Sequence, residues 1–167
     1  MPVPLSVARH FVEAGWYLGR VIEVPARYPE GHAATEILLE FCGLKVGERG
    51  AGIECAQTYV AFEPLGEPVE EILELEKVLQ TQILGIGTAD YLDLYADAQG
   101  HVFAFADVSG GVYFAGRSMF EAAERLLLGR YLMPLLLPSQ ASVGFYGQEL
   151  YPADKRLFSL EDLGPTR

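Results

Sequence analysis

Apolar residues recur along the chain at two spacings, one typical of amphipathic helices and the other typical of strands. The helical spacing predicts four helices, over residues 5–14, 32–42, 69–80 and 118–129. Apolar or alternating runs predict strands over residues 53–62, 81–86, 91–96, 101–106 and 112–115. Residues 21–24 fit either a short strand or an extended arm. These elements mix along the chain, which indicates a domain of both α and β structure.

Turn and capping residues indicate where several of these elements begin or end. Gly15 and Gly43 each follow a helical pattern, and glycine readily takes the left-handed conformation that ends a helix. Ser118 and Glu121 have the spacing of a capping box at the start of the last helix. The tetrapeptide Asp97-Ala98-Gln99-Gly100 separates two apolar runs, so it predicts a hairpin with Asp97 as the turn former.

Length, composition and charge indicate a single domain and narrow the choice of partners. The chain has 167 residues, half of them hydrophobic, and can bury a core without disulfide or metal support. Its formal net charge of -11 disfavours nucleic acid and anionic membranes, because like charges repel, and favours a basic partner or simply solubility. The chain shows no signal-peptide pattern, no bilayer-spanning apolar segment and only two cysteines. We therefore expect a cytoplasmic protein with free thiols.

The residues that usually carry catalysis or bind metals are few and scattered. His10, His32 and His101 lack the spacing of a metal site, with one another or with Cys42 and Cys55. The glycine pattern of a phosphate-binding loop and the motif of a serine nucleophile are also missing. We therefore expect no catalytic residue, no metal and no cofactor. His32 is expected at a helix start and His101 at an exposed position.

Acidic residues are the main polar feature of the chain. Glu67 with Glu71, and Glu70 with Glu74, are like-charged pairs four residues apart, each of which costs roughly 0.2–0.5 kcal/mol in an isolated helix. Tolerance of that cost suggests a use for the charge, although a merely solvated helix face is the commoner explanation. Asp93 alternates with apolar neighbours and is expected to point to solvent. The candidate partner-binding residues are Glu63, Glu67, Glu70, Glu71, Glu74, Asp90 and Asp93.

Several short motifs occur in the order typical of one protein family. They are Ala14-Gly15-Trp16 with Gly19-Arg20, Phe41-Cys42-Gly43-Leu44, Phe62-Glu63-Pro64, Ala96-Asp97 with Gly100-His101, and Ala115-Gly116-Arg117-Ser118. In this order and spacing, across roughly residues 10–130, the chain resembles the SUKH superfamily of bacterial immunity proteins. The resemblance is strongest to the third subgroup of that superfamily.

This resemblance implies both a fold and a role. The implied fold is α+β, with helices packed against a twisted antiparallel sheet. Residues 1–130 are expected to form this SUKH-like domain. Residues 131–167, for which the family has no counterpart, are expected to form a C-terminal extension that packs on the same domain. Such proteins are typically encoded beside secreted or contact-delivered toxins, often nucleases, and bind the toxin domain inside the producing cell. The family shares no catalytic residues.

Two functions remain open on these grounds. In the first, the chain is an immunity protein, a monomer or weak dimer. It neutralises a cognate basic toxin, a nuclease or another nucleic-acid-modifying enzyme, through its acidic surface. In the second, it is a non-catalytic scaffold or regulatory domain of the same fold that acts on a cellular partner. A small enzyme that uses Cys42 or Cys55 with a histidine is the least favoured reading.

Overall fold

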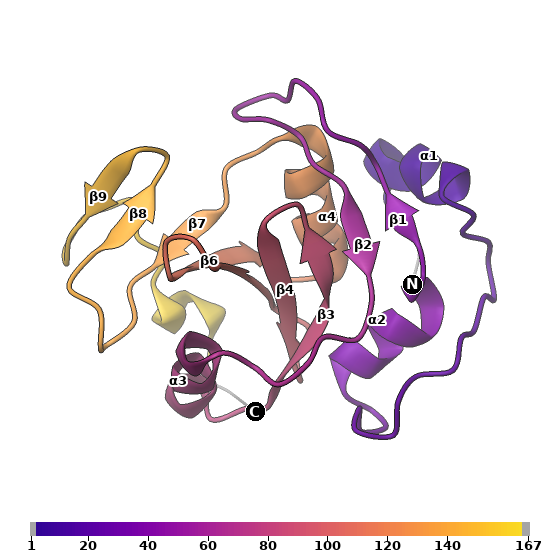
Figure 1. Ribbon diagram of the computed structural model, residues 1–167, viewed down its shortest axis with the longest axis horizontal. Helices are drawn as coiled ribbons and strands as arrows, with labels where there is room; N and C mark the ends of the chain where they lie inside the picture. The colour runs from indigo at the N-terminus through magenta and orange to yellow at the C-terminus, as the bar shows by residue number, and fades with distance from the viewer. Residues whose placement is uncertain (1–2, 165–167) are drawn as a thin grey trace.

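The computed structural model describes residues 3–164 and contains a seven-stranded antiparallel sheet with helices on both faces (Figure 1). The strands lie in sequence order across the sheet: β1 (Lys45–Val46), β2 (Val60–Phe62), β3 (Ile83–Ala89), β4 (Leu92–Asp97), β5 (Val102–Ala106), β6 (Gly111–Gly116) and β7 (Met133–Leu135). The helices are α1 (Leu5–Glu13), α2 (Ala33–Phe41), α3 (Glu70–Leu79) and α4 (Met119–Leu128), and a 3-10 turn, η1, covers Leu160–Leu163. A separate hairpin pairs β8 (Val143–Phe145) with β9 (Gln148–Leu150). The predicted α+β class is confirmed.

The hairpin of β4 and β5 forms where the sequence predicts it. Leu92 pairs with Ala106 and Ala96 with Val102. The buried Asp97 carboxylate accepts hydrogen bonds from the backbone N–H groups of Gln99 and His101, at 3.0 and 2.9 Å. It also lies 2.7 Å from Nδ1 of His101, whose side chain is only 17% exposed. The expectation of an exposed His101 is therefore wrong, because the turn former draws the imidazole inward.

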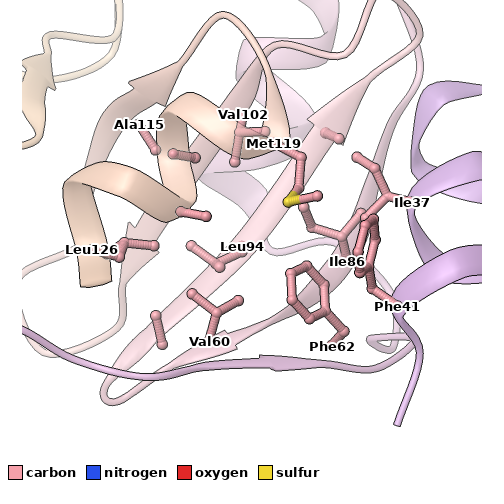
Figure 2. Packing of buried hydrophobic residues seen from close by; sticks show 14 of the residues in the cluster. Ile37, Phe41, Val60, Phe62, Ile86, Leu94, Val102, Ala115, Met119 and Leu126 are labelled. Carbon is pink, nitrogen blue, oxygen red and sulfur yellow. The ribbon is translucent and has the colours of Figure 1, made fainter. Parts of the chain in front are cut away.

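One face of the sheet packs against α1, α2 and α4. Four phenylalanines join these elements: Phe11, Phe41, Phe62 and Phe120 have neighbouring ring centroids 5.3–6.2 Å apart. Figure 2 shows Phe41 of α2 beside Phe62 of β2, with Met119 at the start of α4 above them. The aromatic cluster thereby connects the first two helices to the sheet, and burial of such large side chains contributes strongly to stability.

The end of α2 is held by an arginine from the preceding segment. The Arg20 guanidinium donates to the carbonyls of Glu40 and Cys42 at 2.6 and 2.7 Å, and Trp16 Nε1 donates to the Glu40 carboxylate. Carbonyls at a helix C-terminus lack intrahelical donors, so a charged fork satisfies them well. Gly43 follows with a φ of +85°, the left-handed conformation predicted for it.

The opposite face of the sheet is covered by α3 and by residues of the C-terminal extension. Ile72 and Leu75 of α3 pack on this face with Tyr95, Phe103 and other large side chains of the central strands. The extension adds β7 to the sheet edge and then returns, so that Phe158 stacks on Phe114 of β6 with a centroid distance of 4.0 Å. The backbone N–H of Phe158 donates to the carbonyl of Pro134 at 2.8 Å, which fixes this return.

The structure departs from the predicted elements mainly near β2. Of the strand predicted over residues 53–62, only residues 60–62 are strand, because the preceding segment bends back to bond the end of α4: Ile53 N–H donates to Leu128 O and Thr58 N–H to Leu126 O. The strands β1, β7, β8 and β9 were not predicted. Residues 21–24 form an extended arm without strand pairing, in which Ile22 N–H donates to Leu39 O. The four predicted helices are confirmed, with ends shifted by at most two residues.

Removal of the Phe158 ring tests the contribution of the extension to stability. We expect Phe158→Ala to lower the free energy of unfolding by about 2 kcal/mol, less than for a fully buried phenylalanine because Phe158 is partly exposed. Urea denaturation measures this change. Tyr151→Ala is the matched control, because this tyrosine of the same extension is 61% exposed, and its loss is expected to shift the midpoint little. Equal midpoints for the two variants would show that the stacked ring adds nothing.

Candidate partner-binding surface

Three carboxylates gather on the face of the sheet that also carries α3. Asp93 lies in β4 two residues before Tyr95, which packs in the core under α3, so both side chains point to this face. Burial raises the pKa of the Asp93 carboxyl, and the negative charges of Asp107 and Glu63 raise it further. None of the three carboxylates forms an ion pair with another residue of the described range 3–164. We call Glu63, Asp93 and Asp107 the acidic cluster.

The acidic residues at the start of α3 extend this negative surface. Glu70 is exposed at the first position of the helix, and Glu67 is exposed in the loop before it. The Glu71 carboxylate lies beside the β5–β6 turn, with Oε1 3.6 Å from the position that a Cβ on Gly110 would occupy. That turn begins at Asp107, so Glu71 lies next to the segment that carries one member of the acidic cluster.

Two other predicted site residues make intramolecular contacts. The Glu74 carboxylate accepts a hydrogen bond from Ser139 N at 2.8 Å and another from the Ser139 hydroxyl, which ties α3 to the C-terminal extension. Asp90, in the β3–β4 turn, forms an ion pair with Arg49. Their negative charges are therefore already engaged within the chain, unlike those of the acidic cluster.

Sequence reasoning missed Asp107 as a member of the acidic surface. It follows the apolar run of β5 and precedes the glycine-rich turn, which makes it look like an ordinary polar residue at a strand end. The signal was available in the strand alternation, because Asp107 lies two residues after Phe105, and Phe105 pairs with Asp93. Only the pairing register, which the sequence does not give, places the two carboxylates together.

His32 and Cys42 occupy structural positions. His32 is the N-cap of α2, as predicted: its Nδ1 accepts from Ala34 N–H at 3.1 Å and its Nε2 lies 3.0 Å from Gln82 O. Burial raises the pKa of the Cys42 thiol, which disfavours the reactive thiolate. Among residues 3–164 no group of three or more His, Cys, Asp and Glu side chains is arranged to hold a metal ion.

The helices give no indication of a membrane segment. None of those within residues 3–164 combines the length and the apolar character that crossing a bilayer requires.

Comparison with known families supports the resemblance seen in the sequence motifs. The family model described as SUKH-3 immunity protein matches residues 3–129, well over half of the chain. The chain belongs to the SUKH-3 immunity protein family, and this membership indicates a role as an immunity protein. Comparisons with curated proteins and with solved structures gave no significant match.

The motifs that carry the family resemblance support the fold and lie apart from the acidic cluster, except for Glu63. Arg20 holds the end of α2 and Asp97 forms the β4–β5 turn. Ser118 caps α4 by accepting from Glu121 N–H at 3.2 Å. In turn the Glu121 carboxylate accepts from Arg117 N–H at 2.9 Å, one residue before the expected capping-box donor. These motifs therefore identify the scaffold and say little about the bound partner.

The contact between Glu74 and Ser139 gives a prediction about the extension. We expect Glu74→Ala to free residues 136–142, raise their amide hydrogen exchange and cost about 1 kcal/mol of stability, because two hydrogen bonds to one carboxylate are lost. Hydrogen exchange followed by mass spectrometry measures the effect. Glu70→Ala is the control, because the Glu70 side chain makes no such contact. Indistinguishable hydrogen exchange in the two variants would show that the contact between Glu74 and Ser139 does not hold the extension in place.

The raised pKa of Asp93 gives a prediction with a defined sign. The folded state disfavours the charged form of Asp93. The ionised carboxylate therefore lowers the free energy of unfolding above its raised pKa, and this destabilisation disappears as the pH falls through that value. We expect Asp93→Asn to raise the urea midpoint at pH 7 and to leave it unchanged below 3.8, the ordinary aspartate pKa. Asp162→Asn, at an exposed position, is the control. A lower midpoint for Asp93→Asn at pH 7 would mean that the carboxylate stabilises the fold.

Proposed function

We propose that this chain neutralises a toxin by covering a basic surface of that toxin with the acidic cluster and the first turn of α3. Family membership supports the immunity role. One observation supports the surface: burial and the negative charges of Asp107 and Glu63 raise the pKa of Asp93, and none of these three carboxylates pairs with a cation within residues 3–164. Such mutual repulsion is unfavourable in the free protein. A cationic partner would relieve it on binding.

The chemistry of nucleic-acid-modifying toxins fits this surface. Such enzymes hold phosphate groups with lysine and arginine, so their substrate clefts are positively charged. An acidic protein can occupy that cleft in place of the substrate, and its net charge of -11 speeds the encounter. The proposed interface comprises Glu63, Glu67, Glu70, Glu71, Asp93 and Asp107. Glu74 and Asp90, held by Ser139 and Arg49, support the edges of that surface.

Co-expression with the toxin encoded beside the chain tests the function. We expect the chain to restore growth of cells that express the toxin domain, and the two proteins to elute together from a gel-filtration column. The absence of both rescue and a complex would contradict toxin neutralisation. It would favour a scaffold role on a cellular partner.

Charge reversal at the start of α3 tests the surface. We expect the triple variant Glu67→Lys, Glu70→Lys, Glu71→Lys to associate with the toxin domain at least roughly tenfold more slowly, and with a weaker dependence on salt, because long-range attraction is lost. Stopped-flow association rates at several salt concentrations measure both effects.

The control has the same change in net charge at another place. Glu23→Lys, Glu36→Lys and Glu48→Lys alter exposed positions in the arm before α2, on α2 and after β1. This variant should slow association much less. Equal slowing in both triple variants would indicate that only the total charge matters and would remove the α3 surface from the interface.

A further inference from the structure

A pocket with aromatic walls lies at the end of the sheet, next to the turn that begins at Asp107. Its volume is about 460 Å³, and it opens between the β3–β4 turn, the β5–β6 turn and the β8–β9 hairpin. The aromatic side chains that line it are Tyr91, Tyr113, Phe145 and Tyr146. Tyr91 and Tyr146 are 64% and 52% exposed. Tyrosines that face solvent around a hollow are typical of the energetic centres of protein interfaces.

The hairpin that forms one wall of the pocket is fixed in place. The Tyr113 hydroxyl donates to the carbonyl of Gly144 at 2.7 Å, and the Tyr146 hydroxyl donates to Cys55 Sγ at 3.6 Å. The centroid of the Tyr146 ring lies 4.3 Å from that of Tyr131 and 4.9 Å from that of Phe145. A wall held by hydrogen bonds and ring contacts loses little conformational freedom when a ligand enters.

The charge of the pocket is negative. Glu149 is the one charged residue that lines it, and within residues 3–164 the Glu149 carboxylate has no ion-pair or hydrogen-bond partner. Glu149 Oε1 lies 4.0 Å from the position that a Cβ on Gly144 would occupy, in the pocket wall, and the charge of Glu149 adds to the effect of burial in raising the pKa of Tyr113. Arg156 lies near the ring of Phe145, but its guanidinium is paired with Asp154.

From this combination we propose that the pocket receives an arginine side chain of the partner protein. A guanidinium is planar and stacks on tyrosine faces, and a carboxylate at the rim can accept its N–H groups. A lysine would gain less, because its ammonium is a strongly hydrated point charge. The inference rests on the proposed function and names the kind of contact that the toxin makes.

The location of the pocket suggests that it provides specificity. Tyr91 and Tyr113 belong to the part of the chain matched by the family model, whereas the β8–β9 hairpin lies beyond its last matched residue, 129. Figure 1 shows this hairpin at the end of the molecule opposite α1. An arginine anchored there would distinguish one toxin from another by a feature that the family scaffold alone does not supply.

Titration of the full chain with short capped peptides tests the pocket without the toxin. The peptides Gly-Gly-Arg-Gly-Gly and Gly-Gly-citrulline-Gly-Gly have central side chains of nearly the same shape, but citrulline lacks the positive charge and has a carbonyl oxygen in place of one NH2 group; a third peptide carries phenylalanine there. We expect the arginine peptide to shift the NMR resonances of Tyr91, Tyr146 and Gly147 and to bind at least about fivefold more tightly than the other two. Equal binding of the citrulline or phenylalanine peptide, or shifts confined to other residues, would overturn the proposal.

Substitutions then locate the contact. Glu149→Gln keeps the shape of the pocket and removes its charge, and we expect it to weaken the arginine peptide by about three- to tenfold. Tyr146→Ala should weaken it to a similar degree. The controls are Tyr151→Ala and Glu161→Gln, at exposed positions that do not line the pocket. Equal loss of peptide affinity in the control variants would overturn the assignment. Chemical shifts at the pocket that depend only on protein concentration would also overturn it, because they would indicate a second copy of this chain as the occupant.

The same variants separate this inference from the proposed function. If the unaltered chain rescues cells from the toxin, Glu149→Gln and Tyr146→Ala should shorten the lifetime of the complex about tenfold or more. Unchanged lifetimes would overturn the arginine pocket and leave toxin neutralisation standing. If the unaltered chain fails to rescue, the proposed function falls, and the peptide titration still decides whether the pocket binds arginine.

Discussion

The central strands of this protein are apolar on both faces, and both faces must therefore be removed from water. Along β4 and β5, Leu94 and Ala104 point to the core under α1, α2 and α4, while Tyr95 and Phe103 point to the core under α3. Strands of this kind are stable only between two covering layers. Helices α1 and α2, which precede the sheet, and α4, which lies between β6 and β7, supply the first layer. The single helix α3 supplies only part of the second, and the extension beyond residue 130 completes it through Leu135, Leu137 and Phe158.

This requirement also determines where polar groups can gather. The extension leaves the sheet edge at β7, forms the β8–β9 hairpin and returns to stack Phe158 on Phe114. On the α3 face, Asp107 is exposed and Asp93 is only partly buried, so carboxylates are tolerated there. The hairpin in turn forms one wall of the aromatic pocket.

The sequence predicted those parts of the structure that depend on local signals. Helical spacing, the Ser118 cap and the Asp97 turn each act within a few residues, so the helices and the central hairpin agree with expectation. The strand prediction for the segment before β2 was wrong. The apolar residues of this segment resemble a strand, whereas its backbone forms hydrogen bonds to the end of α4, more than sixty residues away. The bond between Glu74 and Ser139, 65 residues apart, and the meeting of Asp93 with Asp107 depend on register and tertiary packing. The sequence therefore shows which residues are acidic, but it does not predict which of their carboxylates bind other groups of the same chain.

The acidic surface and the aromatic pocket would contribute to binding at different distances. Exposed charges act over roughly 8 Å at physiological salt, so the acidic cluster would guide and accelerate the approach of a basic partner without recognising its details. A tyrosine-lined pocket acts only on contact, where a misplaced or uncharged side chain would leave Glu149 without a partner and lose affinity. The turn from Asp107 to Gly110 joins the two, since Asp107 belongs to the acidic cluster while Val108 and Ser109 line the pocket. The acidic cluster lies on the α3 face, whereas Leu92, Ala106 and Tyr113 of the pocket belong to the other face, so a partner that contacts both must reach around this turn. On the proposed function this proximity lets a strongly acidic protein discriminate among basic partners that charge alone would treat alike.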